Sequence, residues 1–198
     1  MKLDAVHDIQ RAYRKTLDAM SRPGLISNIK AQADNIDVEA GCFNSTVVLA
    51  LMLLDTEVTF KAVSEREAEI SRLINQLTYA RAAEPENADF IFILNDAGPL
   101  ALEKAFKAAC PGNLIDPHKS ATIIVEVATL GNNGDLIITG PGIDRESCIK
   151  VQTTDSWVDI RAEKNVEYPL GIDIIFTDSS HNILCIPRTT QIVKRVVG

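Results

Sequence analysis

The C-terminal part of the chain carries two short apolar runs with a polar turn between them. The runs are Ile172–Phe176 and Ile183–Ile186, and the polar residues Asp178–Asn182 separate them. This pattern predicts a β-hairpin, because turn-forming residues between two apolar runs reverse the chain direction. Pro187 follows the second run and should end that strand, since proline has no backbone N–H to donate. We therefore expect an antiparallel strand pair near the C-terminus.

The rest of the chain shows helical and strand patterns in alternation. Apolar residues recur at steps of three and four near the N-terminus, which predicts one face of a helix; they are Val6, Ile9, Tyr13, Leu17 and Met20. A second helix is expected at 45–54, almost entirely apolar and therefore in the core. Ser64 and Glu67 form the pattern of a capping box. The helix behind it has a stripe of Ile70, Leu73, Ile74 and Leu77, and a fourth helix is expected at 100–109.

Several strands are predicted between these helices. The continuous apolar run Phe90–Leu94 is typical of a strand covered on both faces. The turn Asn132–Asp135 lies between apolar runs and predicts a tight hairpin of Ala121–Leu130 with Leu136–Thr139. Further strands are expected at 57–60 and 149–152. Helices early and antiparallel pairs late favour an α/β fold with a mixed sheet and helices on both faces. No linker is visible, so we expect one domain over residues 1–198.

Composition and length exclude some partners. The net charge of −7 argues against a surface for nucleic acid or anionic membranes, because such surfaces need clustered Lys and Arg. The apolar segment Val47–Leu54 is too short to span a bilayer. The N-terminal residues lack the apolar core of a signal peptide. These features predict a soluble cytoplasmic protein.

Neither a metal site nor a disulfide framework is indicated. The four cysteines are far apart and show no C-x-x-C spacing, so buried free thiols are the better interpretation. They are Cys42, Cys110, Cys148 and Cys185. His7, His118 and His181 are isolated, and a metal needs several converging ligands. We expect these histidines to be exposed to solvent.

An autonomous active site is also not indicated. The chain has no G-x-S-x-G elbow and no G-x-x-x-x-G-K-[ST] loop. Lys119 and Lys150 have no phosphate-binding motif nearby that would suit a Schiff-base lysine. Asp173 and Asp178 lie at opposite ends of one predicted strand, so they do not form a carboxylate pair. We expect no cofactor.

Three rigid turns are the candidate functional segments, because function tends to lie on loops held by a scaffold. They are Arg22-Pro23-Gly24 after the first helix, Gly140-Pro141-Gly142 after a strand, and Arg188-Thr189-Thr190 after Pro187. The glycine turn could cradle a phosphate with backbone N–H groups, or it could simply break the strand. Arg188 could bind a partner chain, a carboxylate or carbonyl of its own chain, or a phosphorylated ligand.

Taken in order, four strings resemble one family. They are QRAYRKTLDAMSRPG at 10–24, LALMLLDTEVTF at 49–60, TGPGI at 139–143, and YPLGIDIIFTD with IPRTT within 168–190. The chain resembles the H subunit of the bacterial carbon–phosphorus lyase complex, which degrades phosphonates, over about residues 7–193. It departs from the family at Gln191, where the family usually has arginine.

The resemblance implies a fold and a role. The fold would be a three-layer α/β/α arrangement similar to the pyridoxal-phosphate-dependent transferases, but without the cofactor. The protein would be a non-autonomous subunit that works with the G, I, J and L proteins and forms a homodimer when isolated. Their system transfers ribose triphosphate from ATP to an alkylphosphonate in place of adenine. The alternative is a free-standing transferase that binds a phosphorylated small molecule through the glycine turn and Arg188.

Overall fold

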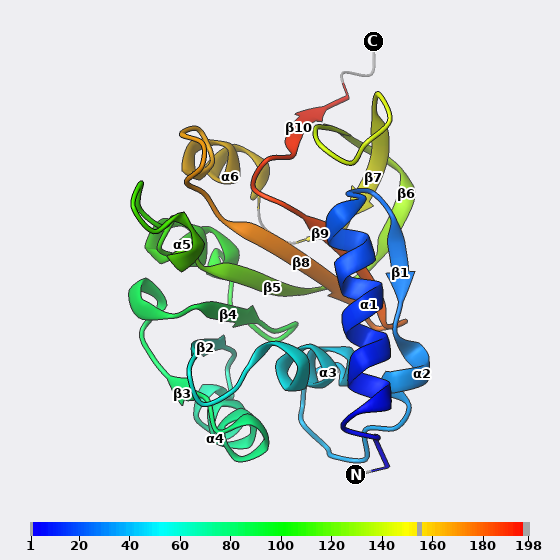
Figure 1. Cartoon of the computed structure of the whole chain (residues 1–198), viewed down its shortest axis with the longest axis vertical. Helices are drawn as coiled ribbons and strands as arrows, with labels where there is room; N and C mark the ends of the chain where they lie inside the picture. Colours follow the sequence, from blue (N-terminus) through cyan, green and yellow to red (C-terminus); the bar gives the residue numbers. More distant parts are fainter. Residues whose placement is uncertain (1, 154–155, 196–198) are drawn as a thin grey trace.

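The computed structural model describes residues 2–153 and 156–195. Its centre is a mixed seven-stranded sheet in the order β1-β9-β8-β5-β4-β2-β3 (Figure 1). Strands β3, β2, β4, β5 and β8 run parallel, whereas β9 is antiparallel to β8 and β1 is antiparallel to β9. The strand bounds are β1 Ile26–Asn28, β2 Thr59–Val63, β3 Arg81–Ala82, β4 Phe90–Ile93, β5 Thr122–Val127, β8 Asp173–Asp178 and β9 Asn182–Ile186.

A small antiparallel sheet, in the order β10-β6-β7, adjoins the large one. Its strands are β6 Leu130–Thr139, β7 Ser147–Val151 and β10 Gln191–Lys194. The helices are α1 His7–Ser21, α2 Lys30–Ala33, α3 Asn44–Leu53, α4 Glu67–Thr78, α5 Ala101–Ala108 and α6 Val158–Lys164. Two short 3₁₀ turns, η1 Pro85–Asn87 and η2 Pro117–Lys119, complete the described part.

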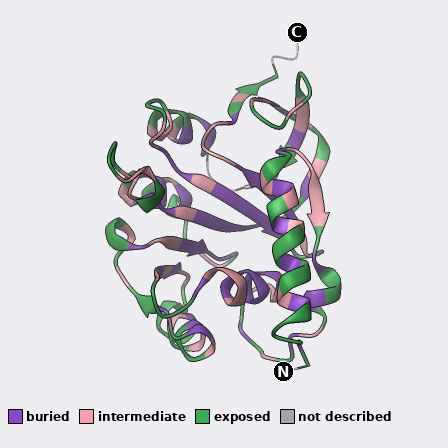
Figure 2. Cartoon of the chain, in the orientation of Figure 1, coloured by how far each residue is buried: buried purple, intermediate pink, exposed green. Residues whose placement is uncertain are grey.

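The core lies on both faces of the large sheet. One cluster of buried residues joins α1, α3 and α4 to one face, for example through Phe60, Phe92 and Ile175. The other cluster joins the opposite face to α5, α6 and the small sheet, for example through Ile123 and Phe176. The central strands are accordingly buried along most of their length (Figure 2). The expected mixed α/β fold is confirmed, and the small sheet forms part of one outer layer.

The predicted C-terminal hairpin is present. Strands β8 and β9 pair antiparallel, with Phe176 opposite Leu184. Both strands are interior strands of the large sheet, with β1 beyond β9 and β5 beyond β8, and both are buried along most of their length. Strand β9 ends at Ile186, directly before Pro187, as expected.

The predicted hairpin around Asn132–Asp135 is wrong. Strand β5 pairs in parallel with β4 and β8, while β6 pairs with β7 and β10. The polar residues lie inside β6, where its register against β7 shifts between Gly131 and Leu136. Burial on both faces decided the pairing of β5: from Ile123 onward the strand is buried at every position. A strand with apolar side chains on both faces buries all of them inside a covered sheet, whereas a two-stranded ribbon would leave one face exposed to water.

The predicted capping box is wrong as well. Helix α4 begins at Glu67, and no side chain caps its first turn. The Ser64 hydroxyl accepts a hydrogen bond from the Arg66 backbone N–H and donates one to Asp96. Glu67 accepts a hydrogen bond from Lys61 Nζ at 2.7 Å instead of reaching back to the helix start. A tertiary ion pair therefore replaces the local cap. Strand β2 likewise begins at Thr59, later than the expected 57–60 segment.

Helix α1 forms where predicted, but its apolar stripe is not its buried face. The buried positions are Asp8, Ala12, Thr16 and Ala19. Val6, Tyr13 and Leu17 are 69%, 52% and 54% exposed. Small side chains let the helix backbone lie close to α3 and β9. Among the described residues, no helix is both long and apolar enough to cross a membrane.

Candidate functional site

The three candidate turns, which are far apart in sequence, lie side by side in the structure. A Cβ atom on Gly142 would overlap the Ser21 carbonyl oxygen at the end of α1. A Cβ on Gly140 would lie 3.1 Å from the Thr189 carbonyl oxygen. Both glycines have positive φ, of 138° and 81°, a region that favours glycine. Gly140 and Gly142 therefore allow the turn after β6 to touch the other two turns.

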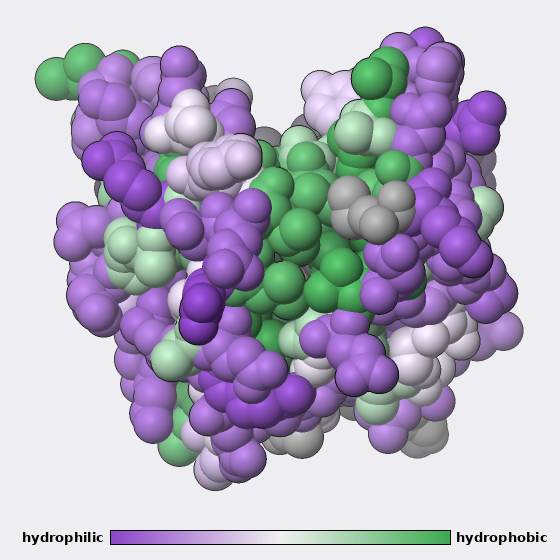
Figure 3. Space-filling model, turned by 90° about the horizontal axis from the view of Figure 1, so that it is seen from below, coloured by the Kyte–Doolittle hydropathy of each residue, from purple (hydrophilic) through white to green (hydrophobic). Residues whose placement is uncertain are grey.

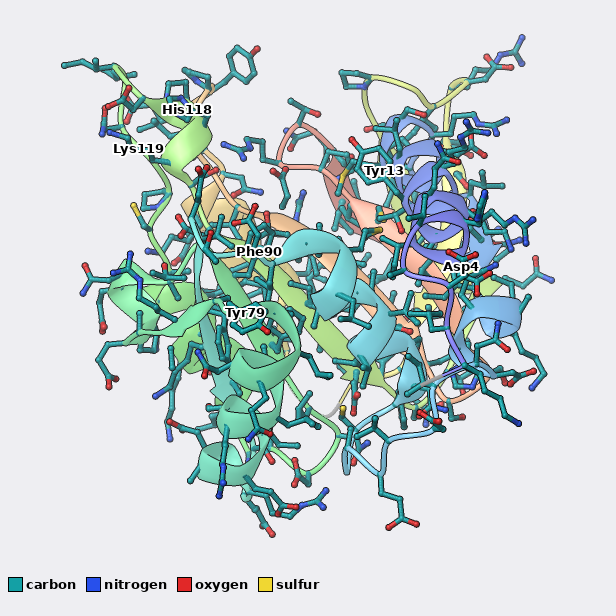
Figure 4. All side chains as sticks on the ribbon, turned by 60° about the horizontal axis from the view of Figure 1, so that its bottom comes forward. Asp4, Tyr13, Tyr79, Phe90, His118 and Lys119 are labelled. Atoms are coloured by element: carbon teal, nitrogen blue, oxygen red, sulfur yellow. The ribbon has the colours of Figure 1, made fainter. Side chains whose placement is uncertain are left out.

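A cavity of about 590 Å³ opens beside these turns. In Figure 4, Tyr13 on α1 lies on one side of the molecule and His118 and Lys119 of η2 lie on the other. The cavity is lined by residues from α1, η2, the turns after β6 and β9, and the segment that leads into β8, namely Met20, Ser21, Pro117, His118, Pro141, Gly142, Tyr168, Pro169, Asp173, Pro187, Arg188 and Thr189.

Not every candidate residue lines the cavity. Arg22 pairs with Asp18 on the exposed surface of α1. Pro23 is buried, and Thr190 is only 1% exposed. These residues, with Gly24 and Gly140, build the turns, whereas Pro141, Gly142, Arg188 and Thr189 face the cavity.

The Arg188 guanidinium is held within its own chain. Its Nη2 donates to Asp173 Oδ2 at 2.6 Å, and its Nε donates to Asp173 Oδ1 at 3.3 Å. Its Nη1 donates to the Pro117 carbonyl at 3.0 Å. The pair is largely buried, with side-chain exposures of 18% and 20%. Arg188 therefore ties the turn after β9 to the start of β8 and to η2, which fits the intramolecular interpretation of this residue.

Arg161, on α6, binds the same turn through its carbonyl groups. This residue was not identified from the sequence. Its Nη1 donates to the Thr190 carbonyl at 2.9 Å, and its Nη2 donates to the Pro187 carbonyl at 2.6 Å. The residue is 2% exposed, and burial lowers the pKa of its guanidinium to about 10. Nothing in its sequence neighbourhood distinguishes it from a solvent-exposed arginine on a short helix.

A second buried polar centre lies at the carboxyl ends of β4 and β5. Glu126 Oε1 accepts hydrogen bonds from the Phe43 backbone N–H at 2.6 Å and from the Thr46 hydroxyl at 2.5 Å. Its Oε2 accepts from the Asn95 backbone N–H at 3.0 Å and from Asn95 Nδ2 at 2.7 Å. Burial raises the pKa of this carboxyl, and the four donors oppose that rise. In the sequence, the one indication of this centre is that Glu126 is an acidic residue inside the otherwise apolar strand Thr122–Val127.

The Glu126 carboxylate borders a cleft of about 280 Å³. All four of its acceptor positions are occupied by donors of the chain. It therefore joins the start of α3 to the ends of β4 and β5, and it has no acceptor left for a ligand.

The histidines and lysines take different positions from one another. His7 is exposed, as expected. It is the first residue of α1, and its ring contacts the Asp4 carboxylate. His118 is exposed, as expected, whereas His181 is half-buried, which corrects the expectation of exposure for that residue. Lys119 pairs with Asp116 at 2.8 Å, and Lys150 is exposed on β7.

The thiols are free, and they differ in burial. Cys185 is buried, whereas Cys42, Cys110 and Cys148 are half-buried. Burial raises the pKa of Cys42 and of Cys185 to about 12, so neither is a reactive thiolate at neutral pH. Within residues 2–153 and 156–195, no group of three or more His, Cys, Asp or Glu side chains is arranged to hold a metal ion.

The sequence matches the model of one protein family, described as bacterial phosphonate metabolism protein (PhnH), over residues 2–193. The chain belongs to the PhnH family. It is 29% identical over 184 residues to a protein of Stutzerimonas stutzeri named putative C-P lyase subunit protein HtxG, covering 92% of this chain and 85% of that protein. It is 26% identical over 192 residues to alpha-D-ribose 1-methylphosphonate 5-triphosphate synthase subunit PhnH of Rhizobium meliloti (strain 1021), covering 96% and 93%. The predicted family is confirmed.

Proposed function

We propose that this protein is a non-autonomous subunit of the carbon–phosphorus lyase core complex in organic phosphonate catabolism. It acts in the cytoplasm with the G, I and L subunits in the transfer of ribose triphosphate from ATP to an alkylphosphonate, and J acts later. It forms a homodimer when isolated. The observation that carries this proposal is the end-to-end similarity to a relative named as a subunit of the synthase for the product of that transfer.

The contacts at the three turns support a role in assembly. The two arginines at the turns are bound to the chain itself: Arg188 to Asp173, and Arg161 to the carbonyls of Pro187 and Thr190. A guanidinium already paired with a carboxylate gains little from a second anion. The turns therefore offer a rigid surface for another chain more readily than a binding group for phosphate.

The same proposal includes a fold relationship to the pyridoxal-phosphate-dependent transferases without the cofactor. The layered arrangement around a mostly parallel sheet is compatible with such a relationship. Lys119 and Lys150 are both exposed, and Lys119 pairs with Asp116. Neither lysine has the surroundings that a Schiff-base lysine needs.

The alternative function is a free-standing transferase that binds a phosphorylated small molecule. One observation favours it, since the cavity of about 590 Å³ is large enough for such a ligand and is lined by Arg188, His118 and Tyr168. In this alternative, the phosphate of the ligand has to replace the Asp173 carboxylate as the partner of the Arg188 guanidinium.

Mass measurement tests membership of a complex. We expect the purified chain, mixed with the G, I and J subunits, to elute in a particle whose mass by light scattering equals a sum that includes this chain. The isolated chain should elute with the mass of a dimer. If the chain elutes separately from the partner subunits at micromolar concentration while they associate with each other, the proposal is wrong.

A further inference from the structure

The cavity of about 590 Å³ is bordered by two parts of the molecule that stand apart, η2 with His118 and the end of α1 with Ser21. Figure 3 shows the outline of the molecule indented at its upper edge, between two projecting lobes. In Figure 4, a similar view, His118 belongs to the lobe on the left, and α1 lies toward the lobe on the right. The volume falls within the range of small-molecule sites in proteins. The chemistry of the lining decides which class of small molecule fits.

The charges at the cavity compensate one another. Arg188 and Asp173 form an ion pair at 2.6 Å, and Lys119, next to His118, pairs with Asp116. An anion bound here would meet an arginine whose charge is already compensated, and a cation would meet a carboxylate in the same condition. The lining therefore favours a ligand that is uncharged where it contacts the ion pair.

The Arg188–Asp173 pair keeps unused hydrogen-bonding capacity. A guanidinium has five N–H donors, and a carboxylate has about four acceptor positions. Arg188 Nη2 donates to Asp173 Oδ2, and this is the one bond that a described residue donates to that oxygen. An N–H of Nη2 and an acceptor position of Oδ2 therefore remain, on side chains that line the cavity and are 18% and 20% exposed. A hydroxyl group can use both, because it donates and accepts at once.

Two further polar groups of the lining have no hydrogen-bond partner among the described residues. They are the Thr189 hydroxyl and the His118 ring. Thr189 directly follows Arg188, and His118 directly follows Pro117, whose carbonyl accepts a bond from Arg188. Four polar side chains thus border one cavity and can bind several neighbouring hydroxyl groups of one ligand.

The rest of the lining is mostly apolar, and much of it is rigid. Tyr168 and four of the eight prolines of the chain border the cavity, and these prolines are Pro117, Pro141, Pro169 and Pro187. Because proline fixes φ, such a lining loses little freedom when a ligand binds. The ring of Tyr168 offers an apolar face to a ring-shaped ligand. A sugar ring combines an apolar C–H face with neighbouring hydroxyl groups, so it matches both parts of the lining.

We propose that this cavity binds the ribose ring of a nucleotide, or of the product made from it, while the Arg188–Asp173 pair stays intact. The proposal rests on the proposed function, because ATP and the ribosylated phosphonate both contain ribose. The ribose hydroxyl groups bind the ion pair, Thr189 and His118, and the ring face packs against Tyr168. The site therefore differs from the one in the alternative function, in which a phosphate replaces Asp173.

Saturation-transfer NMR and calorimetry test the ligand class on the full chain, alone and mixed with the G, I and J subunits, against the same subunits without this chain. Adenosine should bind. Adenosine without its two ribose hydroxyl groups, the 2′,3′-dideoxy analogue, should bind at least about tenfold more weakly, because it loses hydrogen bonds and keeps the base. Inorganic phosphate at about 5 mM should not displace adenosine. Methyl ribofuranoside separates the two sources: its binding supports recognition of the ribose alone, as in the product, and binding of adenosine only supports the nucleotide.

A pair of substitutions tests the position of the site. Thr189→Val/His118→Ala should weaken adenosine binding at least about tenfold, because it removes two hydrogen-bonding groups and leaves the ion pair in place. Thr129→Val/His7→Ala is the matched control, because both residues are exposed and lie outside the cavity, and it should leave binding unchanged. Circular dichroism melts confirm that each variant is folded, and the comparison of ligands on the wild-type chain needs no variant.

The outcomes separate this inference from the proposed function. If the wild-type chain associates with no other subunit, the proposed function fails. If it associates with them and shows no contact with adenosine at about 5 mM, alone or in the mixture, only this inference fails. The inference is also overturned if adenine or the dideoxy analogue binds as well as adenosine, if phosphate displaces adenosine, or if the folded Thr189→Val/His118→Ala variant binds adenosine like the wild type.

Discussion

At the scale of single residues, Arg188 joins three segments that the sequence separates. Its planar fork matches the Asp173 carboxylate, and its remaining N–H group bonds the Pro117 carbonyl. Pro187 directly before it limits the backbone of the turn. The residue is thus a structural anchor of the surface that faces the cavity of about 590 Å³.

Arg188→Ala should lower the free energy of unfolding by about 2 kcal/mol, because it leaves a mostly buried carboxylate and a carbonyl without their charged donor. Arg188→Lys should recover only part of this, since an ammonium cannot form the two parallel bonds to Asp173. Urea denaturation of the three proteins measures the difference. Arg22→Ala is the control, because the Arg22–Asp18 pair is exposed and contributes little. Equal stability of Arg188→Ala and wild type would contradict this role.

The importance of a single residue could be predicted from the sequence only where a recognisable motif surrounds that residue. The three turns stood out because proline and glycine end regular elements, and the structure does bring them together. Arg161 did not stand out, because burial of an arginine depends on which carbonyls the tertiary fold leaves to be satisfied. Arg188 stood out, but the sequence could not assign Asp173 as its partner among several carboxylates.

At the scale of elements, Glu126 holds together the start of α3 and the ends of two parallel strands. Its carboxylate accepts the Phe43 backbone N–H and the Thr46 hydroxyl at the first turn of α3. A negative charge at a helix start also interacts favourably with the helix dipole. On its other oxygen it accepts both N–H donors of Asn95, just after β4.

Glu126→Gln should destabilise the fold by about 2 kcal/mol at neutral pH, because the amide NH₂ faces donors that then lose their acceptor. Burial raises the pKa of Glu126 in the folded state. Wild type therefore gains stability from this group as the pH falls through the raised pKa toward the ordinary value, and the gain is lost as the pH rises again. The glutamine does not titrate, so the stability gap should widen on acidification.

Thermal melts of both proteins at pH 7.5 and pH 5 measure that gap. Glu163→Gln, on α6, is the control for removing a carboxylate elsewhere. A gap that stays constant between the two pH values, or narrows at pH 5, would contradict the raised pKa of Glu126.

Element types were predictable, but their neighbours were not. Periodicity identified α1 and α4, an almost entirely apolar segment identified α3, and continuous apolar runs identified β4 and the β8–β9 hairpin. The pairing of β5 failed because a polar turn nearby suggested a local hairpin, whereas the sheet centre needed strands buried on both faces. The buried face of α1 could not be read from hydrophobicity, because close packing selected Ala12 and Ala19 over the larger apolar side chains.

At the scale of the whole molecule, the described part of the chain combines a well-packed core with polar groups bound internally and an apolar helix face left exposed. Belonging to the PhnH family places it in phosphonate metabolism. The family could be predicted from four ordered strings. The exposed apolar face of α1 could not, because it depends on which side of α1 the fold buries.

The central claim is that the chain acts only as part of a complex. The most direct measurement is adenine release from ATP and methylphosphonate, followed by chromatography, with the full set of subunits, with this chain omitted, and with this chain alone. We expect release with the full set, loss of release on omission, restoration when the purified chain is added back, and none from the chain alone. Adenine release by the chain alone, or undiminished release without it, would contradict the account.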